Sequence, residues 1–208
     1  NLRLRPDQEH GYSMGVDLGD GVGATPSVIS IKDLDTGYKV GRWLSRRTKP
    51  ETMAKVIYCM GLWVGGRGKA PIVAVEANGG RGTTVLEDLK RMRYPRIYRH
   101  AEVATQGAKK AAALGWMSTS PRKKAALEGF SNSLFRGTFK NPDIRSIKEA
   151  RTYVHMRDEM GRGSRIAPRS LGHLNDADLA EHGDVVIADM LSDLGGIHAG
   201  SQRIEEPQ

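Results

Sequence analysis

The stretch GVDLGDGVGATPSV, residues 15–28, sets the first strand of the fold and its first candidate site. The run YSMGVD, residues 12–17, is typical of a strand, and glycines break that strand directly afterwards. Asp17 therefore lies at a strand end, and Asp20 lies inside a glycine-rich loop. Such a loop can hold a phosphate, hold a metal ion or simply turn the chain.

Three familiar kinds of loop fit this stretch poorly. A dinucleotide-binding loop requires a helix immediately after it, whereas Pro26 begins a strand-like run. A calcium-binding loop requires oxygen ligands at alternating positions, where Gly19 and Gly21 stand. The phosphate loop of sugar kinases and actin fits locally, but those proteins have two lobes and 208 residues are too few for both. A metal-dependent nuclease remains, because a carboxylate at a strand end suits Mg²⁺ or Mn²⁺.

Strand and helix patterns follow one another over the first hundred residues. Their order is β-β-β-α-β-α-β, in which three antiparallel strands lead into parallel βα units. The expected elements after the first strand are strands at 26–33 and 38–44, a helix from Pro50 to Gly65-Gly66, a strand buried on both faces within 70–80, a helix at 83–93 and a short strand at 95–100.

The second half of the chain gives weaker signals, and we expect one domain over residues 12–195. The flanking residues 1–11 and 196–208 are expected to be flexible. Further expected elements are a helix within 118–135 with Pro121 near its start, a helix over 141–156 capped by Asp143, a basic loop or hairpin at about 155–172, and a closing helix ended by Gly195-Gly196.

The composition points to a nucleic-acid partner and away from a membrane. A formal charge of +8 and a pI near 9.7 favour a polyanionic ligand. No apolar run approaches the roughly 18 residues that a membrane helix needs, and no signal peptide is visible. The single Cys59 excludes an intramolecular disulfide and a cysteine-based zinc site, and we expect it to be a small buried side chain.

A second acid, Glu76, ends the apolar run PIVAVE. A carboxylate in that position is costly unless it is solvated, paired or bound to a metal. In the predicted order of elements, the first strand and this strand are neighbours. We therefore expect Asp17 and Glu76 to meet at one edge of the sheet, although an acid that simply points to water is the alternative.

A third acid lies in the closing helix. Asp184, Ala188 and Leu191 share one helical face, and the small Ala188 allows the helix to approach the sheet closely. Asp189 and Asp193 lie on another face, which we expect to meet solvent. Spacing alone leaves open whether Asp184 joins the other two acids.

Together these motifs resemble the nuclease domain of the large terminase subunit of tailed bacteriophages. The resemblance spans residues 12–193. It is carried by GVDLGDGVGATPSV with Asp17, by VAVEANGGRGTTVLEDLKRMRYPRIYRH with Glu76, by HGDVVIADMLS with Asp184, and by the Gly-Trp, Thr and Lys stretch LGWMSTSPRKKAAL.

The resemblance implies an α/β fold of the ribonuclease H-like class, with a mixed sheet flanked by helices. It implies a metal-dependent endonuclease that cleaves double-stranded DNA during viral genome packaging with two Mg²⁺ or Mn²⁺ ions. Asp17, Glu76 and Asp184 map to its catalytic, metal-binding acids. The family often has another acid before the serine of strand two, where this chain has Thr25-Pro26-Ser27, and Asp20 is the candidate replacement.

Basic residues are expected to neutralise the DNA backbone without reading its sequence. The stretch GGRGTT lacks the lysine of a phosphate-binding loop, so we expect an isolated nuclease domain whose family partners are an ATPase motor of the same polypeptide, the portal and the small terminase subunit. The implied location is the cytoplasm of an infected bacterial host, without secretion. The candidates for DNA contact are Lys109, Lys110, Arg122, Lys123, Lys124, Arg162 and Arg165.

Two other interpretations stay open at this stage. One is another ribonuclease H-like nuclease, such as a Holliday junction resolvase or a transposase. The other is a DNA-binding or assembly module without catalysis.

Overall fold

The structure is a computed structural model, which describes residues 6–7, 9–19, 25–65, 69–101, 112–157, 164–168 and 183–205. The elements, in chain order, are β1 (Tyr12–Asp17), β2 (Ser27–Asp33), β3 (Lys39–Ser45), α1 (Pro50–Gly65), β4 (Ile72–Val75), α2 (Gly79–Arg91), β5 (Arg99–Ala101), β6 (Ala112–Leu114), α3 (Ser120–Phe135), α4 (Ile144–Ala150), β7 (Tyr153–Arg157), β8 (Ser164–Pro168) and α5 (Asp184–Glu205).

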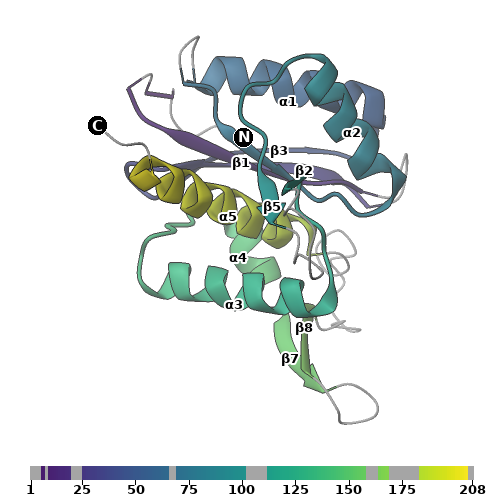
Figure 1. Cartoon of the computed structure of the whole chain (residues 1–208). Helices are drawn as coiled ribbons and strands as arrows, with labels where there is room; N and C mark the ends of the chain where they lie inside the picture. Colours follow the sequence, from purple (N-terminus) through teal and green to yellow (C-terminus); the bar gives the residue numbers. More distant parts are fainter. Residues whose placement is uncertain are drawn as a thin grey trace, which may run out of the picture.

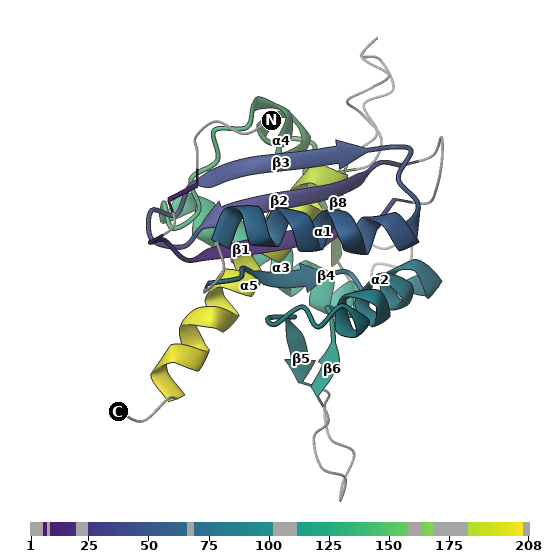
Figure 2. The same ribbon diagram turned by 90° about the horizontal axis from the view of Figure 1, so that it is seen from above.

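A four-stranded mixed sheet with the order β3-β2-β1-β4 forms the centre of the molecule. β1 and β2 pair antiparallel, as do β2 and β3, whereas β4 runs parallel to β1. Helices α1 and α2 cover one face of this sheet, and α5 covers the other, with α3 and α4 packed beyond it (Figures 1 and 2). The predicted meander, the parallel fourth strand and the flanking helices are confirmed.

Beyond β4 the sheet continues through two short segments. Ile97 forms a parallel bridge with Val73 near the start of β4, and Trp116 forms one with Glu76 just past its end. The backbone amide of Trp116 donates to the carbonyl of Val75, and the amide of Ala77 donates to the carbonyl of Trp116. These bonds bring the start of α3 to the end of β4 where Glu76 lies.

The alternation of side chains along β1 divides the interior into two cores. Tyr12, Met14 and Val16 point into the core under α1 and α2. The residues between them face α5, where the Oγ of Ser13 donates to the carbonyl of Ser192 at 2.7 Å. The second core joins β4, α3 and α5, with Ile72, Ala74, Leu127, Phe130, Phe139, Val186, Ile187, Met190 and Leu191 among its members.

The backbone of α5 lies directly against β1 at Gly15. A Cβ at that position would lie 2.0 Å from the carbonyl oxygen of Ala188 and 2.3 Å from the amide nitrogen of Ser192. No side chain fits into that space. The prediction that Ala188 lets the helix approach the sheet closely is therefore confirmed, with Gly15 as its partner.

The prediction that Asp189 and Asp193 meet solvent is wrong, because both are buried. Lys39 lies 2.7 Å from Asp189, and Lys32 lies 2.7 Å from Asp193; both lysines come from the meander and are buried as well. The helix is enclosed on this side too, so its polar face pairs with polar groups instead of water. Asp189 also accepts hydrogen bonds from Ser30, Asn141 and Ser146.

The helix predicted over residues 141–156 divides into two elements. Asp143 caps it as expected, since its side chain accepts a hydrogen bond from the amide of Arg145, but α4 ends at Ala150. Tyr153–Arg157 instead forms β7, which pairs antiparallel with β8. The expected basic hairpin therefore exists, and Figure 1 shows it projecting away from the sheet. Pairing with β8 outweighs the weak helical pattern of these residues.

The closing helix does not end at Gly195-Gly196, and residues 196–205 continue α5 in place of the expected flexible tail. The two glycines serve close packing instead of capping. A Cβ on Gly195 would touch Ile72, Ala74 and Ser13, and one on Gly196 would lie 2.6 Å from Leu34. At the other end, His10 and Gly11 of the predicted flexible segment bond to Asp33 and Asp35.

Two smaller points concern the surface. Cys59 is exposed on α1, so the expectation that it is buried is wrong. Among the helices of the described residues, none has the length and apolar character needed to cross a membrane.

Because α5 touches β1 through backbone at Gly15, Gly15→Ala should destabilise the domain by about 1–3 kcal/mol or more, as overpacking does. Urea unfolding followed by circular dichroism measures the change. The matched control is Gly129→Ala in α3, where a Cβ meets nothing within 4 Å. That change should stabilise the helix by about 0.5–1 kcal/mol. Equal effects of the two changes would contradict the backbone contact.

Candidate functional site

The ends of β1 and β4 bring the first two predicted acids together. Val16 is in register with Val75, so Asp17 and Glu76 follow side by side, and the amide of Glu76 donates to the carbonyl of Val16 at 3.1 Å. Asp17 is buried, and Glu76 is partly buried. The prediction that the two acids meet at one edge of the sheet is confirmed.

Asp184 is the first residue of α5 and lies at the same edge. The contact between Ala188 and Gly15 fixes the helix over β1, one turn away from Asp184. One carboxylate oxygen of Asp184 is fully buried. Asp184 is close enough to Asp17 for its negative charge to affect the ionisation of that residue. The structure therefore gathers Asp17, Glu76 and Asp184 into what we call the acid cluster.

The acid cluster strongly perturbs Asp17. Burial raises the pKa of Asp17 well above its ordinary value, and the negative charges of Glu76 and Asp184 raise it further. A hydrogen bond between the side chains of Asp17 and Glu76 acts in the same direction. The positive charge of Lys123 opposes these effects and lowers the pKa. Carboxylates forced together in this way suit a divalent cation.

The predicted DNA-binding residues divide between described and undescribed segments. Arg122, Lys123 and Lys124 lie in the first turns of α3, whose N-terminus is capped by Thr119. Lys124 approaches Glu128 at 3.9 Å. Arg165 lies in β8, in register with Met156. Asp20, Lys109, Lys110 and Arg162 fall outside the described residues.

Two side chains tie neighbouring segments to the acid cluster. Asn78 follows Glu76 closely, and its amide group both accepts from the backbone amide of Ser118 at 2.6 Å and donates to the carbonyl of Ser118 at 2.7 Å. These two hydrogen bonds hold the start of α3 beside the end of β4, and they place Lys123 there as well. Arg81 of α2 donates to the carbonyl of Gly19 in the loop that follows Asp17.

Sequence reasoning missed Tyr153 as a member of this region. Burial raises the pKa of Tyr153, and the negative charges of Asp17, Glu149, Asp184 and Glu76 raise it further. The hydroxyl therefore lies within electrostatic reach of the whole acid cluster. The sequence offered no signal for this position, because Tyr153 follows a helix without any functional motif.

A second group of possible metal ligands lies at the opposite end of β1. Within the described ranges, His10, Asp33 and Asp35 are the group of three whose ligand atoms all lie within 4.8 Å of one another. The acids of the acid cluster are spaced more widely. Asp33 already bonds to His10 at 2.7 Å and accepts from two backbone amides of the following turn. These contacts are typical of a hydrogen-bonded turn, so we assign no metal to the group of His10, Asp33 and Asp35.

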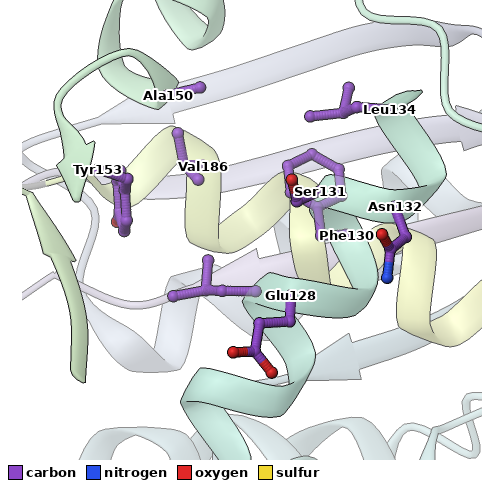
Figure 3. A pocket seen from close by; sticks show the side chains of 9 residues that line it. Glu128, Phe130, Ser131, Asn132, Leu134, Ala150, Tyr153 and Val186 are labelled. Carbon is purple, nitrogen blue, oxygen red and sulfur yellow. The ribbon is translucent and has the colours of Figure 1, made fainter. Parts of the chain in front are cut away.

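A cavity of about 560 Å³ opens between α3 and the first turn of α5 (Figure 3). Its lining is mixed, with apolar residues of both helices and polar residues of α3. Tyr153 and Val186 line it across from the residues of α3. The lining residues are Leu127, Glu128, Phe130, Ser131, Asn132, Leu134, Ala150, Tyr153 and Val186.

The mixed sheet, with acids at the ends of two adjacent parallel strands and at the start of the covering helix, defines a ribonuclease H-like fold. Among solved structures, the chain is similar to the large terminase nuclease of thermophilic phage G20c with bound magnesium, with a TM-score of 0.70 and 18% identity over 92% of this chain and 84% of that one.

Two further solved structures agree. The large terminase nuclease domain of Thermus phage P74-26 gives a TM-score of 0.65 at 17% identity, covering 92% of this chain and 82% of that one. The large terminase nuclease domain of P22 gives 0.53 at 13% identity, covering 99% and 93%. At these identities the likeness establishes the fold. No family model and no curated protein matches the sequence.

The raised pKa of Asp17 predicts how stability depends on pH. The folded state holds the Asp17 proton more tightly than the unfolded chain does, so this contribution to stability is complete below about pH 4 and is lost as the pH rises through the raised pKa. Asp17→Asn should therefore flatten the profile and make the metal-free domain more stable than the wild type at neutral pH.

Urea unfolding in EDTA between pH 4 and pH 8 measures this difference. Glu87→Gln, a change of an exposed acid on α2, is the control and should follow the wild-type profile. Parallel profiles for the wild type and Asp17→Asn would show that Asp17 has an ordinary pKa.

Proposed function

We propose that this chain is a metal-dependent endonuclease that cleaves double-stranded DNA during viral genome packaging, as the nuclease domain of a terminase large subunit. The observation that carries the proposal is the acid cluster on this fold, in which burial and two neighbouring acids raise the pKa of Asp17. A group of acids that repel one another is costly for a fold, and a bound divalent cation relieves that cost.

The donor set supports a hard divalent cation. Three carboxylates from β1, β4 and α5 supply oxygen ligands, which Mg²⁺ and Mn²⁺ prefer. The G20c nuclease, which has the same fold, has been crystallised with magnesium, with cobalt and with zinc. We assign Asp17, Glu76 and Asp184 as ligands of two Mg²⁺ or Mn²⁺ ions, with Asp20 as a further ligand.

The roles of the residues follow from their positions. Bound divalent ions lower the pKa of an attacking water and stabilise the leaving 3′ oxygen of the phosphodiester. Asp17 is within electrostatic reach of both Glu76 and Asp184, which makes it the ligand best placed to be shared. Glu76 directly follows strand β4 of the sheet, and Asp184 is the first residue of helix α5. Lys123, whose charge already reaches Asp17, neutralises the phosphate that enters the acid cluster.

The duplex is held by its phosphates. Arg122, Lys123 and Lys124 at the start of α3 adjoin the acid cluster, and the β7–β8 hairpin with Arg165 extends from the same part of the molecule (Figure 1). Lys109, Lys110 and Arg162 complete the proposed set. Contacts of this kind position the backbone without selecting a base sequence.

The proposed setting follows from the same family likeness. The nuclease acts with an ATPase motor of the same polypeptide, with the portal and with the small terminase subunit, in the cytoplasm of the infected bacterium. No membrane is involved.

Cleavage of plasmid DNA tests the proposal. Weak carboxylate sites fill at roughly millimolar concentrations of a divalent cation. With Mn²⁺ at about that concentration, the wild type should convert supercoiled plasmid to nicked and linear forms. Asp17→Ala should lower the rate by roughly 10³-fold or more, because a shared ligand is lost. EDTA should abolish cleavage in every sample.

Glu87→Gln is again the matched control and should cleave like the wild type, since this acid is exposed and lies outside the acid cluster. Undiminished cleavage by Asp17→Ala would overturn the assigned site. Absence of wild-type cleavage with Mg²⁺ and with Mn²⁺, together with DNA binding, would favour a non-catalytic DNA-binding module. Cleavage confined to four-way junctions would favour a resolvase.

Salt dependence tests the phosphate contacts. Binding to a random-sequence duplex should weaken with a constant slope of log K against log salt. Arg122→Ala and Lys123→Ala should each reduce that slope by about 1, equally for every sequence. Fluorescence anisotropy in Ca²⁺ or EDTA measures binding without cleavage. A slope that these changes leave unaltered would remove α3 from the DNA interface.

A further inference from the structure

The first turn of α5 is held from both sides of Asp184. The backbone amide of Val185, the next residue, donates to Oε2 of Glu149 at 3.0 Å, and the amide of Val186 donates to Glu149 as well. The carbonyl of Gly183, the preceding residue, accepts a hydrogen bond from the hydroxyl of Tyr153 at 3.1 Å. Tyr153 thus bonds to the backbone immediately before Asp184, and Glu149 bonds to the backbone immediately after it.

Glu149 is itself firmly fixed. It is buried at the end of α4, and Oε1 accepts from Nε of Arg145, one turn earlier, at 3.1 Å. Its other oxygen faces the start of α5, where free amides and the helix dipole favour a negative charge. Glu149 therefore serves as an N-terminal cap for α5 that is supplied by another helix.

Tyr153 is tightly fitted to Gly183. Gly183 has a φ of +61°, in the left-handed region, and a Cβ there would lie 2.2 Å from the Tyr153 hydroxyl oxygen. The chain therefore enters α5 through a bend that only glycine allows, directly against this tyrosine. The bend determines the direction in which Asp184 leaves the backbone.

Apolar packing and polar contacts act together at the first turn of α5. The cavity between α3 and α5 borders Val186 and Tyr153, so the described part of α3 does not fill the space beside the turn (Figure 3). The turn is nevertheless packed on its other side, because Val185 and Val186 are buried in the core clusters like Ala188 and Leu191 further along the helix. Packing fixes the apolar side of the turn, and the two polar contacts fix its backbone on either side of Asp184.

We propose that Glu149 and Tyr153 are positioning residues, which set the carboxylate of Asp184 against Asp17 and Glu76 and thereby set the affinity of the acid cluster for a divalent cation. This inference rests on the proposed function, because it assigns a role within the same metal site. Neither residue is proposed to touch the cation or the DNA. Partners that orient a metal ligand typically change metal affinity by about 10–100-fold when they are removed.

Calorimetric titration of the whole chain with MnCl₂ tests the inference without relying on cleavage. Tyr153→Phe and Glu149→Gln should each weaken Mn²⁺ binding by about 10–100-fold. Tyr94→Phe is the matched control, because the Tyr94 hydroxyl is also buried and also donates to one backbone carbonyl, that of Pro71 at 2.8 Å. Tyr94 lies at the far end of β4 from Glu76, so this control should bind Mn²⁺ like the wild type.

Thermal unfolding of the same samples separates positioning from a general loss of stability. Tyr153→Phe and Tyr94→Phe should lower the melting temperature by similar amounts, while Tyr153→Phe alone changes Mn²⁺ affinity. If the wild type binds Mn²⁺ and Tyr153→Phe binds it as tightly, this inference is wrong and the proposed function stands. A wild type that binds no Mn²⁺ overturns the proposed function and this inference together.

Discussion

The backbones of β1 and α5 touch at Gly15, and this contact sets the position of the helix over the sheet. Because no side chain separates them, the helix lies as close to the sheet as a backbone can, with the carbonyl of Ala188 over Gly15. Asp184 stands one turn from Ala188, and Asp17 stands two residues from Gly15. A single close approach therefore fixes the distance between an acid of the first strand and an acid more than 160 residues later in the chain.

Buried charges fix the orientation of the same helix. Lys32 and Lys39 project from the meander to Asp193 and Asp189, which lie one turn apart on α5. Buried ion pairs add little net stability, because desolvation costs about as much as the attraction returns. They do penalise alternatives strongly, since a helix shifted or rotated by one residue would leave buried charges without partners. We interpret the two ion pairs as contacts that disfavour any other register of α5, which keeps Asp184 at the edge of the sheet where β1 and β4 end.

The sequence predicts the features that depend on nearby residues and misses those that depend on distant ones. The meander, the apolar β4, the cap of α4 and the acids at strand ends follow from patterns within a few residues, and all are present. The burial of Asp189 and Asp193, the continuation of α5 through Gly195 and Gly196, and the place of Tyr153 beside the acids depend on partners more than 100 residues away or on a neighbouring strand. No local pattern contains them.

The same helix thus carries two classes of acid that composition cannot distinguish. Asp189 and Asp193 form ion pairs with buried lysines, so their contacts are accounted for by the fold. Asp184 differs, because its charge and that of Glu76 both raise the pKa of Asp17, so keeping these acids close together is costly. A single change to asparagine would relieve that repulsion, so the fold by itself does not require three acids here. That cost, together with the three carboxylates, supports the proposed cation, whereas Asp189 and Asp193 of the same helix are paired with lysines.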